Sequence, residues 1–343
     1  MAAYKKKAKK APRRRSTSAK AEQSDDDKKI LEDARDGLKA CVDAEESERE
    51  KMMDDLRFAT LDQWPADIRR ERENDVENGP RPCLTIDKIN QYIVQILNDI
   101  RQGKPGINVR PQDDVADPET AKVLKGLVRN IEDQSKADIA YLAAVESAVK
   151  IGLGYFRITT EYVSDDSFKD QEIFVRPIPN TFAVYLGPHI MPDGSDAELG
   201  YIVDTMPVEN FKAEFPKAKW KATEFHDFLG LAESSYWRDG ETVTVIEEYR
   251  IKKSAETLYF LADGTTISRA DYEAWPATGA GQKPTIKDER TNIKRQLQWR
   301  KMTGVEVLDK RDLPGKYIPI VEVIGRESHI DGKRILWGLV RPA

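Results

Sequence analysis

The sequence lacks the long apolar runs and the cysteine clusters on which whole classes of protein depend. No uncharged apolar stretch approaches the roughly 20 residues that a membrane-spanning helix needs. The basic N-terminus is followed by no apolar segment, so it is not a secretory signal. The two cysteines, Cys41 and Cys83, form no CxxC pair. We therefore expect neither a disulfide framework nor a structural zinc site, and a reducing cytoplasm is the default compartment.

The sequence also lacks a nucleotide-binding loop. A P-loop requires Ser or Thr after its Gly-Lys pair, because that hydroxyl binds the metal ion. The three pairs here precede Pro, Tyr and Arg. These pairs begin at Gly103, Gly315 and Gly332. Gly152-Leu153-Gly154 resembles the opening of a dinucleotide loop, but it lies after a helix pattern and before a strand pattern, the reverse of the required order. We interpret it as a tight helix-to-strand turn and predict no cofactor.

Patterns for metal binding and nucleophilic catalysis are equally sparse. The histidines match neither HExxH nor the deaminase pattern, and no GxSxG motif is present. They are His189, His226 and His329. Asp165-Asp166, and Asp193 with Asp196, could bind a cation, but both pairs lie in turn-rich stretches where Asp is favoured for backbone reasons. We predict no catalytic residue, no metal and no enzyme.

Charge is abundant and unevenly distributed. Residues 1–24 hold nine Lys or Arg and one acidic residue, a local charge of +8, so a net charge of -5 leaves -13 on the remaining chain. This segment has almost nothing to bury, and we expect a disordered arm. Such an arm is either a solubilising tail or a non-specific DNA contact. The cationic side chains proposed for that contact are Lys5, Lys6, Lys7, Lys9, Lys10, Arg13, Arg14 and Arg15.

Helical periodicity dominates residues 25–153. We expect helices over residues 24–58, 85–103 and 117–152, because apolar residues recur there at spacings of three and four. Ser24 and Asp117 are typical helix caps, and Pro118 fits the first helical position. An offset in the apolar stripe near Gln134 and Ser135 interrupts the last helix. GINVRP, at 106–111, predicts a short strand.

The apolar period changes to two after Gly154, which is typical of strands. A short helix is expected over 208–215. Strands are expected over 155–159, 173–176, 182–185, 201–206, 242–251, 257–262, 285–302, 303–308 and 317–324. The sequence therefore predicts an α+β fold, with N-terminal amphipathic helices in 25–153 followed by a mostly antiparallel β-rich region in 154–343.

Several sequence blocks recur in a known order and spacing. They are FATLDQW (58–64), RPCLTIDKINQYI (81–93), NDIRQGKPGINVRP (98–111), IEDQSKADIAY (131–141), GLGYFRITTEY (152–162), DQEIFVRPIPNTFAVY (170–185) and SDAELGYIVDTMPVENFKAEFP (195–216). Together they resemble the portal, or head-to-tail connector, proteins of short-tailed phages, the P22-like family. The chain departs from that family at Leu61, Asp87 and Gly187, where Gly, Asn and an acidic residue are usual.

The resemblance implies a structural subunit of a dodecameric ring at the portal vertex of the capsid in the virion. Double-stranded DNA would pass through the ring during genome packaging and ejection. The implied partners are further copies of the chain, capsid and scaffolding proteins, terminase and tail-completion proteins, with assembly in the host cytoplasm and no membrane. Both regions, 25–153 and 154–343, would belong to the portal wing. Family members are longer, so we expect the tunnel-lining and clip regions to be absent from these residues.

Two alternatives stay open on the residues alone. The first is a metal-dependent, DNA-processing phage nuclease, suggested by the many acidic residues beside a basic arm. The second is a scaffold or adaptor whose charged helix over 24–57 binds a partner helix.

Overall fold

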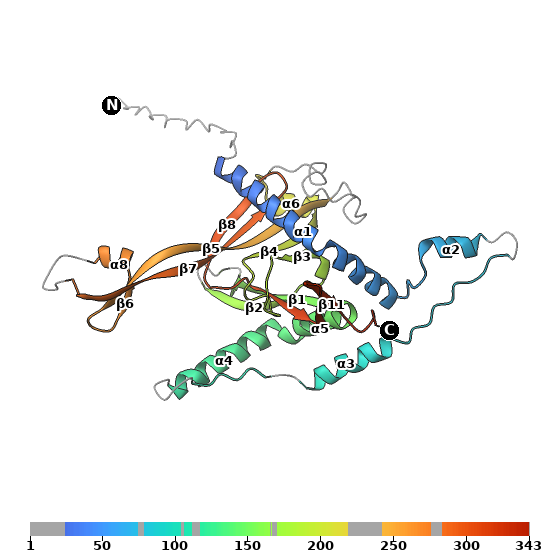
Figure 1. Cartoon of the computed structure of the whole chain (residues 1–343), viewed down its shortest axis with the longest axis horizontal. Helices are drawn as coiled ribbons and strands as arrows, with labels where there is room; N and C mark the ends of the chain where they lie inside the picture. The colour runs from blue at the N-terminus through green and yellow to red at the C-terminus, as the bar shows by residue number, and fades with distance from the viewer. Residues whose placement is uncertain are drawn as a thin grey trace, which may run out of the picture.

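The computed structural model describes residues 25–74, 79–103, 106–111, 117–164, 166, 170–218, 242–275 and 283–342. The larger sheet packs on a smaller sheet, and helix α5 (Ala137–Ile151) covers the smaller sheet. Helix α1 lies on the larger sheet with its first half and contacts α5 with its second half, and further helices and a two-stranded ribbon project from this body (Figure 1). The fold is α+β, as the sequence predicts. None of the helices in the described ranges is long and apolar enough to span a membrane.

The first half of helix α1 (Asp25–Ala59) lies on the larger sheet. Its apolar stripe, Leu31, Ala34, Leu38 and Cys41, is buried against that sheet, as expected for residues at spacings of three and four. Acidic residues occupy its first turn, where they interact favourably with the helix dipole. The predicted helix is confirmed nearly to its last residue.

The larger sheet is antiparallel throughout, with the strand order β3-β4-β5-β7-β8 and β6 paired to β5. Its strands are β3 (Val184–Leu186), β4 (Leu199–Pro207), β5 (Thr242–Leu261), β6 (Thr266–Ser268), β7 (Ile286–Met302) and β8 (Val307–Leu313). Strands β5 and β7 run beyond the sheet as a ribbon, and α8 (Arg269–Glu273) lies at its tip (Figure 1). The prediction of two strands over 242–251 and 257–262 was therefore wrong, because both are parts of β5.

The smaller sheet lies between the larger sheet and α5 (Ala137–Ile151). Its order is β2-β1-β9, formed by β1 (Leu153–Tyr162), β2 (Gln171–Pro177) and β9 (Ile320–Ile324). A separate hairpin follows, formed by β10 (Arg326–Ile330) and β11 (Lys333–Trp337). Asp331 and Gly332 join its strands with φ of 50° and 74°, the left-handed pair that a type I′ turn requires.

Three helices lie between α1 and α5 in the chain. They are α2 (Ala66–Glu73), α3 (Asn90–Gln102) and α4 (Pro118–Ser135). Asp117 caps α4 by accepting the N–H groups of Glu119 and Thr120, and Lys136 in a left-handed conformation separates α4 from α5, at the predicted offset. The remaining short elements are the 3-10 helix Thr181–Ala183 and α6 (Val208–Glu214).

Two expectations near α3 were wrong. The helix begins at Asn90 rather than Thr85, because the Asp87 carboxylate accepts the Asn90 N–H and the residues before it are extended. Ile86 was expected on the apolar face of the helix predicted over 85–103, but it is 65% exposed. Residues 106–111 are not a strand, since they have no sheet partner among the described residues.

Candidate functional site

The residues singled out in the sequence lie in different parts of the structure. The basic side chains from Lys5 to Arg15, together with His226 and Asp165, lie outside the described residues. His329 is exposed beside Glu327, with 3.5 Å between Nε2 and Oε1. His189 lies in a buried polar cluster. Gly152 makes the predicted helix-to-strand turn, with a φ of 93°, whereas Gly154 already belongs to β1 and pairs with Val323.

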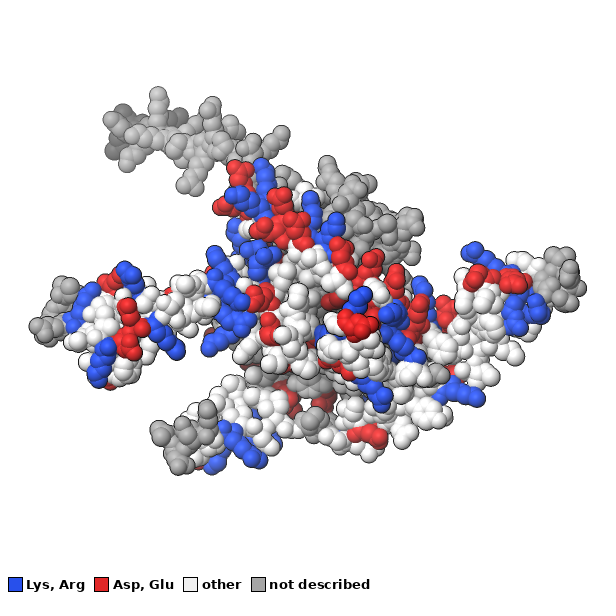
Figure 2. Space-filling model, in the orientation of Figure 1, with Lys and Arg blue, Asp and Glu red and all other residues white. Residues whose placement is uncertain are grey.

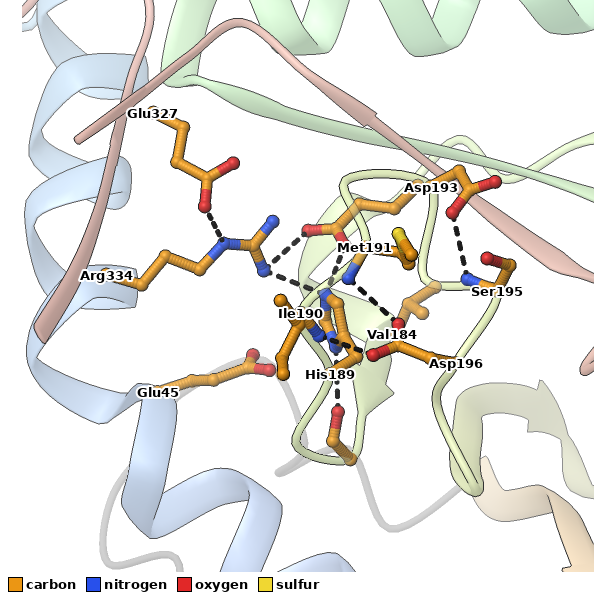
Figure 3. A network of polar contacts seen from close by, with 12 residues as sticks. Glu45, Val184, His189, Ile190, Met191, Asp193, Ser195, Asp196, Glu327 and Arg334 are labelled. Carbon is orange, nitrogen blue, oxygen red and sulfur yellow. Dashed lines mark hydrogen bonds and ion pairs between the residues drawn. The ribbon is translucent and has the colours of Figure 1, made fainter. Parts of the chain in front are cut away.

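The turn that contains Asp193 and Asp196 uses both carboxylates for backbone hydrogen bonds. Asp196 accepts the N–H groups of Ile190 and Met191 at 2.7 and 2.9 Å, and Asp193 accepts that of Ser195 at 3.1 Å (Figure 3). The side chain and N–H of Ser195 hold the pKa of Asp193 below its ordinary value, and the N–H groups of Ile190 and Met191 do the same for Asp196. The two side chains therefore shape the loop. Within the described ranges, no group of three or more His, Cys, Asp or Glu side chains is placed to hold a metal ion.

His189 is the centre of a polar cluster that is buried at His189 and Glu322 and partly exposed elsewhere, and that we call the polar latch: Glu45, Arg49, His189, Glu322, Glu327 and Arg334. His189 Nδ1 lies 2.8 Å from the Gly187 carbonyl oxygen, and Nε2 lies 2.6 Å from Glu322 Oε2. Arg334 Nη1 lies 3.5 Å from Glu322 Oε1, and Arg334 Nε donates to Glu327 Oε1 at 3.0 Å (Figure 3). The side chains of His189 and Glu322 are 7% and 1% exposed.

The latch reaches α1 through Glu45 and Arg49. Arg49 Nε donates to Glu45 Oε2 at 2.7 Å, and its guanidinium also donates to the backbone oxygens of Phe182 and Val184. The same guanidinium lies over the Tyr185 ring, 3.9 Å from its centroid. Helix α1 is thus joined to the 3-10 helix and to β3, which precede His189 in the chain, by contacts of Arg49 to two backbone oxygens and a ring.

Burial and hydrogen bonding set the protonation of the latch. The hydrogen bond to Glu322 raises the pKa of His189, and burial raises the pKa of Glu45. Arg334 Nη1 also lies 2.8 Å from His189 Nε2, so this nitrogen accepts from Arg334 when His189 is neutral and donates to Glu322 when His189 is protonated. With His189 protonated, the three cations and three carboxylates of the latch balance, which is the condition under which buried charge is tolerated.

The latch joins segments that are far apart in the sequence. α1, the loop before β4, β9 and the β10–β11 hairpin each contribute at least one of its charged groups. This arrangement indicates a structural role, because opposite charges lie beside one another and Arg49 and His189 also contact backbone carbonyl oxygens. Sequence reasoning missed it, since nothing in the spacing of Glu45, His189 and Arg334 predicts that they meet.

A shallow hollow of about 290 Å³ lies between the start of α1 and strands β7 and β8. It is lined by Ile30, Gln298, Trp299, Arg300, Lys310, Arg311 and Asp312. Its cations are already paired: Arg300 contacts Glu248, Lys310 contacts Asp27, and Arg311 contacts Asp309. Three paired cations do not make an anion-binding site.

The other notable surface feature is apolar. Large apolar side chains are exposed on the projecting elements, where they find little cover from their own chain. On α4 these are Val123, Leu124 and Leu127, and on the extended segment before α3 they are Leu84 and Ile86. Exposed apolar residues grouped on projecting elements indicate contact with another macromolecule.

Comparisons with known proteins agree on one family. The family model described as "Phage P22-like portal protein" matches residues 35–343. The chain is also similar to the "Portal protein" of Acyrthosiphon pisum secondary endosymbiont phage 1, with 26% identity over 308 residues. That alignment covers 84% of this chain and 41% of the relative, so the chain spans about two fifths of the relative's length.

Proposed function

The chain belongs to the phage P22-like portal protein family, and we propose on that basis that it supplies the wing-side part of a ring-forming portal subunit. The observation that carries this proposal is the family match over residues 35–343, which includes every sheet of the structure. Portal proteins are structural components of the phage particle. The ring would form the channel through which double-stranded DNA is packaged and ejected.

Two features of the structure support a structural role. The buried charges of the latch are used to hold backbone segments together. Large apolar residues are exposed on α4 and on residues 84–86, and others lie on the body, as expected for a subunit that makes further contacts. We propose a ring of twelve copies at one capsid vertex, which contacts capsid and scaffolding proteins. Terminase would bind the ring during packaging, and tail-completion proteins would replace it afterwards.

The place of the protein in the particle can be tested directly. Antibodies raised against residues 25–74, which include the exposed side of α1, would be used for immunogold labelling of phage particles from the encoding strain. We expect one labelled vertex per particle. Particles without label, or with label on every vertex, would contradict a portal assignment.

Ring formation needs a separate measurement. Negative-stain electron microscopy of the purified chain, together with sedimentation velocity over a range of protein concentrations, should reveal closed rings with a central channel. A monomer that persists at the highest concentration would contradict ring assembly by this chain. Incubation of the same sample with DNA and Mg²⁺ or Mn²⁺ tests the nuclease alternative, because any cleavage would favour that alternative.

For the N-terminal segment we propose weak, non-specific contact with DNA through the basic side chains from Lys5 to Arg15. Deletion of residues 1–20 should then lower DNA retention at low salt and leave a smaller dependence of retention on salt concentration. Equal retention with and without the segment would leave a solubilising tail as its role.

A further inference from the structure

His189 lies where three neighbouring groups place conflicting demands on its ring. Nδ1 lies 2.8 Å from the Gly187 carbonyl oxygen, and Nε2 lies 2.6 Å from Glu322 Oε2. A carbonyl and a carboxylate only accept hydrogen bonds. Arg334 Nη1 lies 2.8 Å from the same Nε2, and a guanidinium only donates. An acceptor and a donor therefore compete for one ring nitrogen.

Each protonation state of His189 leaves at least one of these contacts unsatisfied. The protonated ring donates to Gly187 and Glu322, but it turns an N–H toward the Arg334 guanidinium, a second cation. The neutral ring with its proton on Nδ1 donates to Gly187 and accepts from Arg334, but it turns a lone pair toward the Glu322 carboxylate. The neutral ring with its proton on Nε2 fails at both Gly187 and Arg334. The site therefore fits a change between two arrangements, one for each charge state.

The Arg334 guanidinium shows the same conflict from the side of β11. Nε donates to Glu327 Oε1 at 3.0 Å, and Nη1 lies 3.5 Å from Glu322 Oε1. Nη2 is buried and finds no hydrogen-bond acceptor within the described part of the chain. A buried donor in this condition is uncommon, because it has lost water without replacement. The Glu322 side chain is 1% exposed and that of Arg334 is 24% exposed, so Arg334 is the partner with room to move.

Most other ionisable side chains around His189 keep one charge state near neutral pH. Hydrogen bonds lower the pKa of the two aspartates below, and burial raises the pKa of the two tyrosines. Glu45 is the exception, because burial raises its pKa toward neutrality, so an experiment must separate it from His189. The surrounding groups are Glu45 and Arg49 of α1, Tyr155 of β1, Tyr185 of β3, Asp193 and Asp196 of the loop that carries His189, Glu322 of β9, Glu327 of β10 and Arg334 of β11.

Charges farther away have little influence on this site. Figure 2 shows acidic and basic side chains side by side along α1 and over the body. At physiological ionic strength, exposed charges more than about 8 Å apart are largely screened from one another, and mixed signs cancel further. The immediate neighbours of His189 therefore control its proton.

We propose that His189 is a proton-operated switch that exchanges partners between two parts of the fold. When His189 is protonated, it binds Glu322, which holds the loop of residues 187–198 on β9, and the positive ring displaces Arg334. When His189 is neutral, it accepts from Arg334, which becomes the nearest cation of Glu322 and holds the β10–β11 hairpin against the loop. A proton at His189 thus loosens the hairpin.

The sign of the effect follows from linkage. The hydrogen bond to Glu322 raises the pKa of His189 above its ordinary value, whereas the charge of Arg334 lowers it. The ring therefore binds its proton less tightly with the hairpin held than with the hairpin open. Stability of the held hairpin is then gained as pH rises between the two pKa values, and it is lost as pH falls through them.

Hydrogen exchange followed by mass spectrometry tests the switch on the purified full chain. Each observed rate is divided into the intrinsic rate at the same pH, which gives protection factors for peptides of residues 326–337. Since one proton is exchanged, the change is at most about tenfold per pH unit. We expect hairpin protection to rise about tenfold from about pH 6 to about pH 9, while protection in β5 and β7 does not rise. Hairpin protection that is level or falls over this range would overturn the proposal.

Two histidine variants identify the group that titrates. His189→Gln should make hairpin protection independent of pH. The matched control is His329→Gln, which changes a histidine of the hairpin itself whose side chain is 65% exposed, and it should keep the rise seen in the wild type. A rise that persists in His189→Gln would assign the effect to another group, such as Glu45, and would overturn the proposal. Loss of the rise in His329→Gln would do the same in favour of His329.

A measurement on the ring itself covers the case in which His189→Gln fails to fold. The chain has three histidines, so ¹⁵N-histidine labelling of a variant with His226→Gln and His329→Gln leaves only the signals of His189. Above its midpoint the ring should carry its proton on Nδ1, because Nε2 then accepts from Arg334. A neutral ring protonated on Nε2 would refute the exchange of partners. Arg334→Gln should move the midpoint to higher pH, and an unchanged midpoint would refute competition by Arg334.

Discussion

The substitution Glu322→Gln measures how much the polar latch contributes to stability. The Glu322 side chain is 1% exposed, lies 2.6 Å from His189 Nε2, and lies 3.5 Å from Arg334 Nη1. Gln keeps the volume of the side chain but removes the charge that compensates two buried cations. Loss of one partner of a buried ion pair costs about 3–5 kcal/mol. Because His189 can lose its proton and Arg334 keeps Glu327, we expect the lower end, about 3 kcal/mol.

The same substitution should change the dependence of stability on pH. The hydrogen bond to Glu322 raises the pKa of His189 above its ordinary value of 6.5, so the folded chain holds this proton more tightly than the unfolded chain. The resulting stabilisation is complete below the unfolded pKa and is lost as pH rises through the raised folded pKa. Burial raises the pKa of Glu45, so Glu45 also makes the protein less stable as pH rises. The contribution of Glu322 is therefore read from the difference between the wild type and Glu322→Gln, not from the pH dependence of the wild type alone.

Urea unfolding followed by tryptophan fluorescence, at about pH 6 and at about pH 9, provides the measurement. The wild type should lose more of its free energy of unfolding between these two pH values than Glu322→Gln does. The control is Glu327→Gln, because Glu327 is 21% exposed and pairs at the periphery of the latch, so its loss should cost about 1 kcal/mol or less. The reasoning is refuted if Glu322→Gln and the wild type unfold at the same urea concentration at both pH values.

Two further predictions concern packing and capping. Gly154→Ala would place a Cβ 1.9 Å from the Ala144 carbonyl oxygen, so we expect its free energy of unfolding, measured by thermal unfolding, to fall by about 3 kcal/mol. The control is Gly106→Ala, which has open space around it and should stay within about 0.5 kcal/mol of wild type. Asp117→Ala should speed amide hydrogen exchange at Thr120, whose N–H the carboxylate accepts. Hydrogen bonds from the Thr120 hydroxyl and from the N–H groups of Glu119 and Thr120 lower the pKa of Asp117. In the wild type the cap should therefore persist below pH 3.8 and fail as pH falls through the lowered pKa.

Elements fixed by local chemistry were predictable from the sequence. The stripe of α1 repeats at helical spacing over more than one turn, and the only burial that satisfies it is against a flat apolar surface. Asp117-Pro118 combines a capping carboxylate with a residue that needs no hydrogen-bonded N–H, which fixes the start of α4. Gly152 could be assigned to a turn because a helix pattern ends and a strand pattern begins around it.

Elements fixed by distant contacts were not predictable. β5 continues through KKSAE at 252–256 because it pairs with β7 along its whole length, although both faces of the ribbon meet solvent there and no apolar alternation marks the strand. The Ile86 position fits the stripe of α3, yet the chain before Asn90 is extended, with Trp64 Nε1 donating to the Leu84 carbonyl oxygen at 3.1 Å. Periodicity reports which residues can be buried on a helix, and tertiary contacts decide where the helix begins.

Helix α1 links the polar latch to an exposed row of acidic side chains, Asp43, Glu46 and Glu50. Arg49 points inward, where it donates to the Phe182 carbonyl oxygen and pairs with Glu45, while Asp43, Glu46 and Glu50 are exposed. A helix cannot rotate one of these faces without the other, since each residue adds a fixed turn about the axis. The inward contacts therefore fix the direction of the acidic row relative to the larger sheet and to the ribbon that extends from it. A head-to-tail ring tolerates little variation in the angle between its two contact surfaces, because an error at each subunit adds up around the circle and prevents closure. The hydrogen bonds from Arg49 to two backbone oxygens oppose sliding of α1 along the sheet more than apolar packing alone would, since they are directional.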